Sequence, residues 1–141
     1  MRIYFSGSIR GGRQDVDLYA RIIEQLKAYG EVLTEFIGQS GLTAQGSSGN
    51  EADIYAKDMA WLTAADVIVA EVTSPSLGVG YELAKAEEMR KPVLCLYRPS
   101  EGKKPSAMIA GCPHFLFRHF SDEAEVPGLL SEFFATATKN D

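Results

Sequence analysis

The sequence predicts one α/β domain, in which a doubly wound, mainly parallel sheet of five strands carries helices on both faces. Runs rich in β-branched residues alternate with helical patterns along the chain, and the runs 66–72 and 92–97 are almost wholly apolar. A length of 141 residues is enough for one core of ordinary size. We therefore expect a single domain over 1–141, with a flexible C-terminal tail from about residue 136.

The first strand begins at Arg2 within the β-rich run 2–9, and the glycine-rich loop Ser6–Gly12 ends it. A helix follows, because Tyr19, Ile22, Ile23 and Leu26 have the spacing of one helical face. Gly30 is the stop signal of this helix. The second strand is expected over Glu31–Phe36.

The stretch Gly38–Asn50 has four glycines and several Ser and Thr residues, which predicts a long loop over the site. Asn50 and Asp53 resemble a capping box, so a second helix should begin there and run to Ala64. Tyr55, Met59 and Leu62 supply its apolar face.

The rest of the chain repeats this alternation. The expected elements are a central strand over 66–72, a loop over 73–80, a helix over 81–90, a strand over 92–97, a loop over 99–105 and a closing amphipathic helix around Leu129, Leu130, Phe133 and Phe134. We expect these strands in flavodoxin-like or Rossmann-like order. Ligands of such sheets bind beyond the carboxyl ends of the strands, so the loops 6–12 and 73–80 should share one crevice.

The composition excludes several classes of partner. Hydrophobic residues make up 45% of the chain and charged residues 23%, which is typical of a globular protein. The net charge of −5 argues against polymeric nucleic acid or a membrane surface as partner. No apolar run approaches the ~20 residues of a membrane span, and Met1–Phe5 leads directly into strand-like sequence, so we expect a cytoplasmic protein.

Metal and thiol chemistry have weak support. Cys95 lies in an apolar run and Cys112 in a turn, without metal-ligand spacing, so both are expected to be reduced and structural. His114 and His119 lie in a late aromatic stretch, where an edge strand or surface position is favoured over a metal site or a catalytic triad. No cofactor and no metal are predicted.

The first of the two loops has the composition of an anion site or of a plain tight turn. Gly7, Gly11 and Gly12 allow backbone amides to approach a phosphate at the head of a helix, and Arg10 adds a permanent cation. The spacing fits neither of the common nucleotide-binding glycine motifs. Ser76 and Gly78 should face this loop, which favours the anion site.

Three further residues have a structural and a catalytic interpretation. Glu82, at the expected opening of a helix, is either a dipole-stabilising acid or a nucleophile or base at the crevice. Asp58 is either a solvated surface acid or an acid that points toward the crevice. Tyr4 is either core packing or a phenol that donates to a carboxylate.

Three separated segments, YFSGSIRGG (4–12), ADVIVAEVT (65–73) and PSLGVGYEL (75–83), closely resemble the 2′-deoxynucleoside 5′-phosphate N-hydrolases of the nucleoside 2-deoxyribosyltransferase superfamily. The likeness also takes in the segments 58–62, 94–96 and 106–109. It therefore extends in order over nearly the whole chain, and the three segments together are far more specific than any one of them.

The resemblance implies hydrolysis of the N-glycosidic bond of 2′-deoxynucleoside 5′-monophosphates to a free base and 2-deoxyribose 5-phosphate. Glu82 matches the nucleophile that forms a covalent glycosyl ester, and Asp58 matches the proton-transfer aspartate. Tyr4 matches the tyrosine that holds the nucleophile and helps to exclude a 2′-hydroxyl. Two carboxyls with different pKa values are the machinery of retaining glycosidases.

The same resemblance implies a pocket for the 5′-phosphate in a homodimer. The matching substrate-binding residues are Gly7, Ser8, Ile9, Arg10, Gly11, Ser76, Gly78, Ser106 and Met108. Ser106 is expected to come from the neighbouring subunit. A site that binds the phosphate with several donors would discriminate against free nucleosides, which favours a hydrolase over a transferase.

Three alternatives stay open at this stage: a ribonucleotide N-glycosidase of the CMP type, a nucleoside 2-deoxyribosyltransferase, and a nucleotide-binding module without turnover. Phe36 departs from the histidine of the mammalian family members, so the resemblance does not define the preferred base.

Overall fold

Within the residues that the computed structural model describes, 1–9, 13–34 and 50–139, five parallel strands form one sheet. The strands are β1 (Arg2–Gly7), β2 (Glu31–Val32), β3 (Val67–Glu71), β4 (Val93–Tyr97) and β5 (Phe115–His119). Their order is β2-β1-β3-β4-β5, so the predicted flavodoxin-like arrangement is confirmed, with β3 at its centre.

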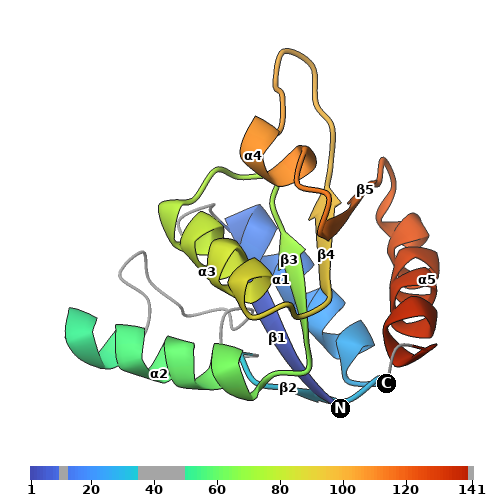
Figure 1. Ribbon diagram of the computed structural model, residues 1–141. Helices are drawn as coiled ribbons and strands as arrows, with labels where there is room; N and C mark the ends of the chain where they lie inside the picture. The colour runs from blue at the N-terminus through green and yellow to red at the C-terminus, as the bar shows by residue number, and fades with distance from the viewer. Residues whose placement is uncertain (10–12, 35–49, 140–141) are drawn as a thin grey trace.

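Helices cover both faces of this sheet (Figure 1). They are α1 (Arg13–Leu26), α2 (Glu51–Ala64), α3 (Leu77–Glu88), the short α4 (Ala107–Ala110) and α5 (Val126–Lys139), which a 3₁₀ turn (Glu123–Glu125) precedes. The buried residues form two clusters. One lies between the sheet and α1 and α5, and the other between the sheet and α2, α3 and α4.

Alternation along β1 assigns its side chains to these two clusters. Ile3 and Phe5 pack on the α1 and α5 side, whereas Tyr4 between them packs on the side of α2 and α3. The strand order reverses between β1 and β3, and their ends are level because Gly7 lies opposite Glu71. This is the position where ligands of such sheets bind.

The second strand is shorter than the sequence predicts. It ends at Val32, and the side chain of Thr34 continues the pairing in its place. The Thr34 hydroxyl accepts from the Phe5 N–H at 2.9 Å and donates to the Phe5 carbonyl. The buried Thr34 hydroxyl thus pairs with both the N–H and the carbonyl of Phe5, on the side of β1 where β2 has ended. Phe36 and the predicted loop up to residue 49 lie outside the described residues.

Two helix boundaries also differ from the prediction. The stretch 73–80 was expected to be a loop, but α3 begins at Leu77, because the Ser76 side chain caps it and accepts from the Val79 N–H at 3.2 Å. The tail expected from about residue 136 is helical to Lys139, since Ala137 is buried against the core. The predicted cap of α2 is confirmed, with Asn50 accepting from the Asp53 N–H at 2.8 Å.

No helix in the described part of the chain is both long and apolar enough to cross a membrane.

Candidate active site

Glu82 is the centre of a hydrogen-bonded cluster that joins α3 to β1. The Tyr4 hydroxyl donates to Glu82 Oε2, and the Ser6 hydroxyl donates to Oε1 at 2.8 Å. Tyr4 and Ser6 are two residues apart in β1, so their side chains point to the same face of the sheet. Because α3 begins at Leu77, Glu82 lies in the second turn of this helix and not at its opening. From there its side chain contacts β1, next to the point where the strand order reverses.

Burial has a strong electrostatic effect on this carboxyl. It raises the pKa of Glu82 to about 7, against the opposing effect of the hydrogen bonds from Tyr4 and Ser6, and the nearby charge of Asp58 raises it further. Glu82 therefore exchanges its proton near neutral pH, as a nucleophile or general base requires. Burial and the charge of Glu82 raise the pKa of Tyr4 well above its usual range, so this phenol remains a donor.

Asp58 lies on α2 and is electrostatically coupled to both residues. It is partly buried, and this burial raises its pKa, whereas the charge of Lys57 lowers it. Within the described part of the chain its carboxyl group makes no hydrogen bond. A carboxyl with a raised pKa is suited to donate a proton to a leaving group. The structure thus brings together the three residues that the sequence suggested for catalysis.

The residues that follow β1 pack against α1. A Cβ on Gly7 would lie 2.8 Å from the Tyr19 ring, so the close approach of this ring explains the glycine. The Ser8 N–H donates to the Tyr19 hydroxyl at 3.1 Å, and Ile9 packs partly buried against the core. The Ser8 amide is therefore already satisfied by the protein. Arg10 and Gly11 lie outside the described residues.

The start of α3 offers free donors. Val79 N–H is bonded to the Ser76 side chain, and Gly80 N–H to the Ser76 carbonyl. The amides of Leu77 and Gly78 make no hydrogen bond within the described residues, and a Cβ on Gly78 would meet only the Ser76 hydroxyl, at 3.9 Å. The backbone at Gly78 is thus open to an anion.

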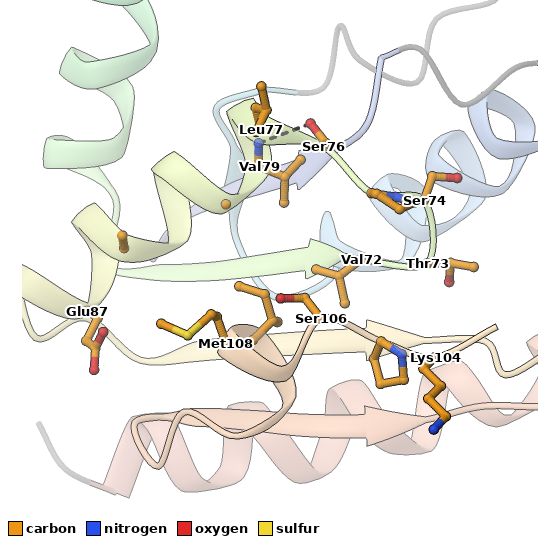
Figure 2. A pocket seen from close by; sticks show the side chains of 15 residues that line it. Val72, Thr73, Ser74, Ser76, Leu77, Val79, Glu87, Lys104, Ser106 and Met108 are labelled. Atoms are coloured by element: carbon orange, nitrogen blue, oxygen red, sulfur yellow. Dashed lines mark hydrogen bonds between the residues drawn. The ribbon is translucent and has the colours of Figure 1, made fainter.

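Ser106 and Met108 line a cavity of about 570 Å³ between α3 and α4, and Ser76 lines the same cavity (Figure 2). Its other lining residues are Val72, Thr73, Ser74, Pro75, Leu77, Val79, Gly80, Ala84, Glu87, Lys104, Pro105 and Ile109. Glu82, Asp58 and Tyr4 are not among them. Within one chain the three catalytic candidates therefore lie outside the cavity that Ser76, Ser106 and Met108 line, and Gly78 is not among its lining residues either.

Sequence reasoning missed Ser6 as a site residue. The signal was present, because Ser6 follows Tyr4 at the two-residue period of a strand and so shares its face. It also missed a link between the two helices that carry the carboxyls, in which the hydroxyls of Tyr55 and Tyr81 are 3.2 Å apart. In the described residues, no group of three or more His, Cys, Asp or Glu side chains could hold a metal ion.

The fold is that of an α/β protein with a parallel sheet. Where its strand order reverses, the protein holds a carboxyl group of raised pKa that accepts hydrogen bonds from two hydroxyls. The chain belongs to the nucleoside 2-deoxyribosyltransferase family, whose profile matches residues 3–127.

The relatives agree with this membership. A 5-hydroxymethyl-dUMP N-hydrolase from Esox lucius is 51% identical over 99% of this chain and 100% of its own length. The 5-hydroxymethyl-dUMP N-hydrolase from Homo sapiens is 47% identical over 94% of this chain and 78% of its own.

Two solved structures share the fold at low sequence identity. A CMP N-glycosidase from Clostridium botulinum has a TM-score of 0.69 at 16% identity, over 94% of this chain and 99% of its own. A 2-deoxyribosyltransferase from Bacillus psychrosaccharolyticus has a TM-score of 0.65 at 20% identity, over 90% of each chain.

Proposed function

We propose that this protein hydrolyses the N-glycosidic bond of 2′-deoxynucleoside 5′-monophosphates and releases a free base and 2-deoxyribose 5-phosphate. The observation that carries the proposal is the Glu82 carboxyl, held by Tyr4 and Ser6 with Asp58 close enough to shift its pKa. The relatives named as 5-hydroxymethyl-dUMP N-hydrolases support the same reaction and suggest a modified pyrimidine nucleotide as substrate.

The proposed reaction has two steps. In the first, the ionised Glu82 attacks the anomeric carbon, the bond to the base breaks, and the base leaves with a proton from Asp58. In the second, Asp58 takes a proton from water, whose oxygen attacks the same carbon and releases Glu82 from its ester. The hydrogen bonds from Tyr4 and Ser6 hold the carboxylate in one orientation, which favours a nucleophile that must be aligned with its target.

The covalent ester can be tested directly. Asp58→Asn should slow the second step, because the water then lacks a base, while a substrate with an easily displaced base still reacts in the first step. We expect the intact protein to gain the mass of one 2-deoxyribose 5-phosphate unit, located on Glu82 by peptide mapping. Turnover without any such adduct, in the wild type and in this variant, would contradict the covalent route.

The 5′-phosphate is proposed to bind at the start of α3 and in the loop after β1. The open amides of Leu77 and Gly78, the dipole of α3 and the Ser76 hydroxyl support this assignment at α3. Gly7, Ser8, Ile9, Arg10 and Gly11 are proposed to form the facing loop. The Ser8 N–H donates to the Tyr19 hydroxyl, so it is not one of the amides proposed to bind the phosphate.

Two glycines of α3 provide a matched test of this phosphate site. Neither Gly78 nor Gly80 meets anything that an added methyl group would strike, so alanine should raise helix stability at both by up to ~1 kcal/mol. We expect Gly78→Ala to raise the KM for the nucleotide, because its methyl group occupies the approach of the phosphate, and Gly80→Ala to leave KM nearly unchanged. Equal KM values in both variants would contradict the placement.

We further propose a homodimer in which Ser106 and Met108 complete the site of the neighbouring subunit. Leu77 and Met108 are 96% and 82% exposed beside the cavity, an unusual exposure for large apolar side chains that a second copy would cover. Sedimentation should give twice the 15.4 kDa of the chain. A monomer that is fully active would contradict the shared site.

Mixed dimers distinguish a Ser106 that acts in its own subunit from one that acts in its neighbour. Glu82→Ala and Ser106→Ala proteins are each expected to be impaired. If Ser106 acts across the dimer, mixing them creates one site that has both native residues, and activity returns. If Ser106 acts within its own subunit, every site in the mixture lacks one of the two residues, and no activity returns.

The first experiment on function is base release from a panel of deoxynucleotides, ribonucleotides and deoxynucleosides, with 5-hydroxymethyl-dUMP, CMP and dCMP included. We expect release from deoxynucleoside monophosphates that Glu82→Gln abolishes and Glu88→Gln, an exposed carboxylate of the same helix, leaves unchanged. Equal rates of base release from deoxynucleotides and free deoxynucleosides would favour a transferase-like site. Faster release from CMP than from dCMP would favour a ribonucleotide glycosidase. Tight binding without release would indicate a nucleotide-binding module.

A further inference from the structure

Glu71 is a buried carboxyl that the proposed reaction does not use. It is the last residue of β3, and its side chain is on the α1 side of the sheet, where Val67 and Val69 also point. Only 1% of the residue is exposed. Burial and the neighbouring Asp15 raise its pKa, whereas Thr73 and Arg98 lower it.

Both oxygens of this carboxyl bind one residue of the loop that follows. The Thr73 N–H donates to Glu71 Oε1 at 3.0 Å, and the Thr73 hydroxyl donates to Oε2 at 2.7 Å. The same hydroxyl accepts from the Arg98 N–H at 2.9 Å, just beyond β4. Thr73 is thus fixed at the ends of two neighbouring strands.

The rest of this loop is tied down in the same way. The Ser74 hydroxyl donates to Asp15 Oδ2 of α1 at 2.7 Å, and the Ser76 hydroxyl caps α3. Figure 2 shows Thr73, Ser74 and Ser76 in succession along the segment that leaves β3 and enters α3. Each of the three hydroxyls therefore has a defined partner, and together they set the direction in which α3 begins.

Burial of the Glu71 carboxyl costs free energy. A buried carboxyl loses its hydration, and no Lys or Arg side chain in the described residues forms an ion pair with Glu71. What it provides, and an apolar residue cannot, is two acceptors at fixed positions for the N–H and the hydroxyl of Thr73. Its role is therefore to fix geometry.

We propose that Glu71 is a positioning residue for the 5′-phosphate: through Thr73 it holds the loop in the one arrangement that presents Ser76 and the first turn of α3 to the substrate. This inference rests on the proposed function. We assign Glu71 no direct contact with the nucleotide: alternation along β3 places its side chain with Val67 and Val69 on the α1 side of the sheet, whereas Glu82 bonds to Tyr4 on the other side.

Thr73→Val tests the inference, because valine keeps the shape of threonine and lacks the hydroxyl. We expect the KM for the deoxynucleotide, and the inhibition constant of 2-deoxyribose 5-phosphate, to rise about tenfold, with kcat within about twofold of the wild type. Thr73→Ser restores the hydroxyl and should restore both constants. Glu71→Gln keeps one acceptor and should have an intermediate effect.

Thr136→Val is the matched control, since it removes the hydroxyl of an exposed threonine of α5, which donates to the Glu132 carbonyl. It should change neither constant. An unchanged KM in Thr73→Val, or a fall in kcat with KM constant, would overturn the positioning role. If the wild type releases no base at all, the proposed function fails instead. The affinity of 2-deoxyribose 5-phosphate for the wild type and for Thr73→Val, measured by calorimetry, then tests the positioning role. Equal affinities would overturn it.

Discussion

Glu82→Gln is expected to abolish base release and, at the same time, to stabilise the folded protein at alkaline pH. Burial raises the pKa of Glu82 from its ordinary 4.5 to about 7 in the folded protein. The folded state therefore binds this proton more tightly than the unfolded state does. The stability that Glu82 contributes is complete below about pH 4.5 and is lost as the pH rises through about 7.

The magnitude follows from the shift. At 1.36 kcal/mol per pKa unit, the wild type should lose about 2 to 3 kcal/mol of unfolding free energy between pH 5 and pH 8 through Glu82 alone. Glutamine stays neutral, so it avoids this loss. Its amide can accept from one of the hydroxyls of Tyr4 and Ser6 and donate to the other, which keeps the cluster connected.

Urea unfolding followed by circular dichroism, at pH 5 and pH 8, measures the effect. The quantity to compare is the free energy of unfolding of Glu82→Gln minus that of the wild type, in which the titration of all other groups cancels to first order. We expect this difference to grow by about 2 to 3 kcal/mol from pH 5 to pH 8. Glu88→Gln controls for the loss of one charge from α3. A difference that is the same at both pH values would refute the reasoning.

Three further outcomes are expected. Tyr4→Phe removes a hydrogen bond that lowers the pKa of Glu82, so the midpoint of the rise of kcat/KM with pH, expected near pH 7 in the wild type, should move to higher pH. Gly30→Ala should destabilise the fold by about 2 kcal/mol or more in urea unfolding, because its Cβ would lie 2.1 Å from the Met1 carbonyl oxygen. Arg90→Gly should raise the melting temperature, with a gain of up to about 1 kcal/mol, since Arg90 has a left-handed φ of 58°.

Patterns of side-chain spacing were sufficient to predict the elements and the sheet. The run 66–72 has no polar alternation and is indeed the central strand, with both faces buried. Two of the boundaries that were predicted wrongly, the end of β2 and the start of α3, each depend on a single hydroxyl. Thr34 replaces strand pairing with its side chain, and Ser76 caps a helix whose first turns contain two glycines, which by composition resembled a loop.

The site was predicted less completely than the fold. Tyr4, Asp58 and Glu82 were suggested by resemblance, and the structure brings them together. Ser6 could have been found from strand alternation. Glu71 could not, because a carboxyl that bonds two residues further along its own chain leaves no periodic signal in the sequence.

Glu82 and Asp58 differ in the hydrogen bonds that hold their carboxyl groups, and this difference fits the different tasks proposed for them. Glu82 is held by two hydroxyls of β1, an inner strand of the sheet, and in the proposed reaction it meets one atom, the anomeric carbon, in both steps. The carboxyl group of Asp58 makes no hydrogen bond within the described residues, and in the proposed reaction it serves two atoms, first of the departing base and then of the attacking water. A fixed carboxylate lowers the entropic barrier to attack, whereas an acid held only by its helix can reorient between two partners. The hydrogen bonds of this site are thus concentrated on the residue that gains most from being immobile.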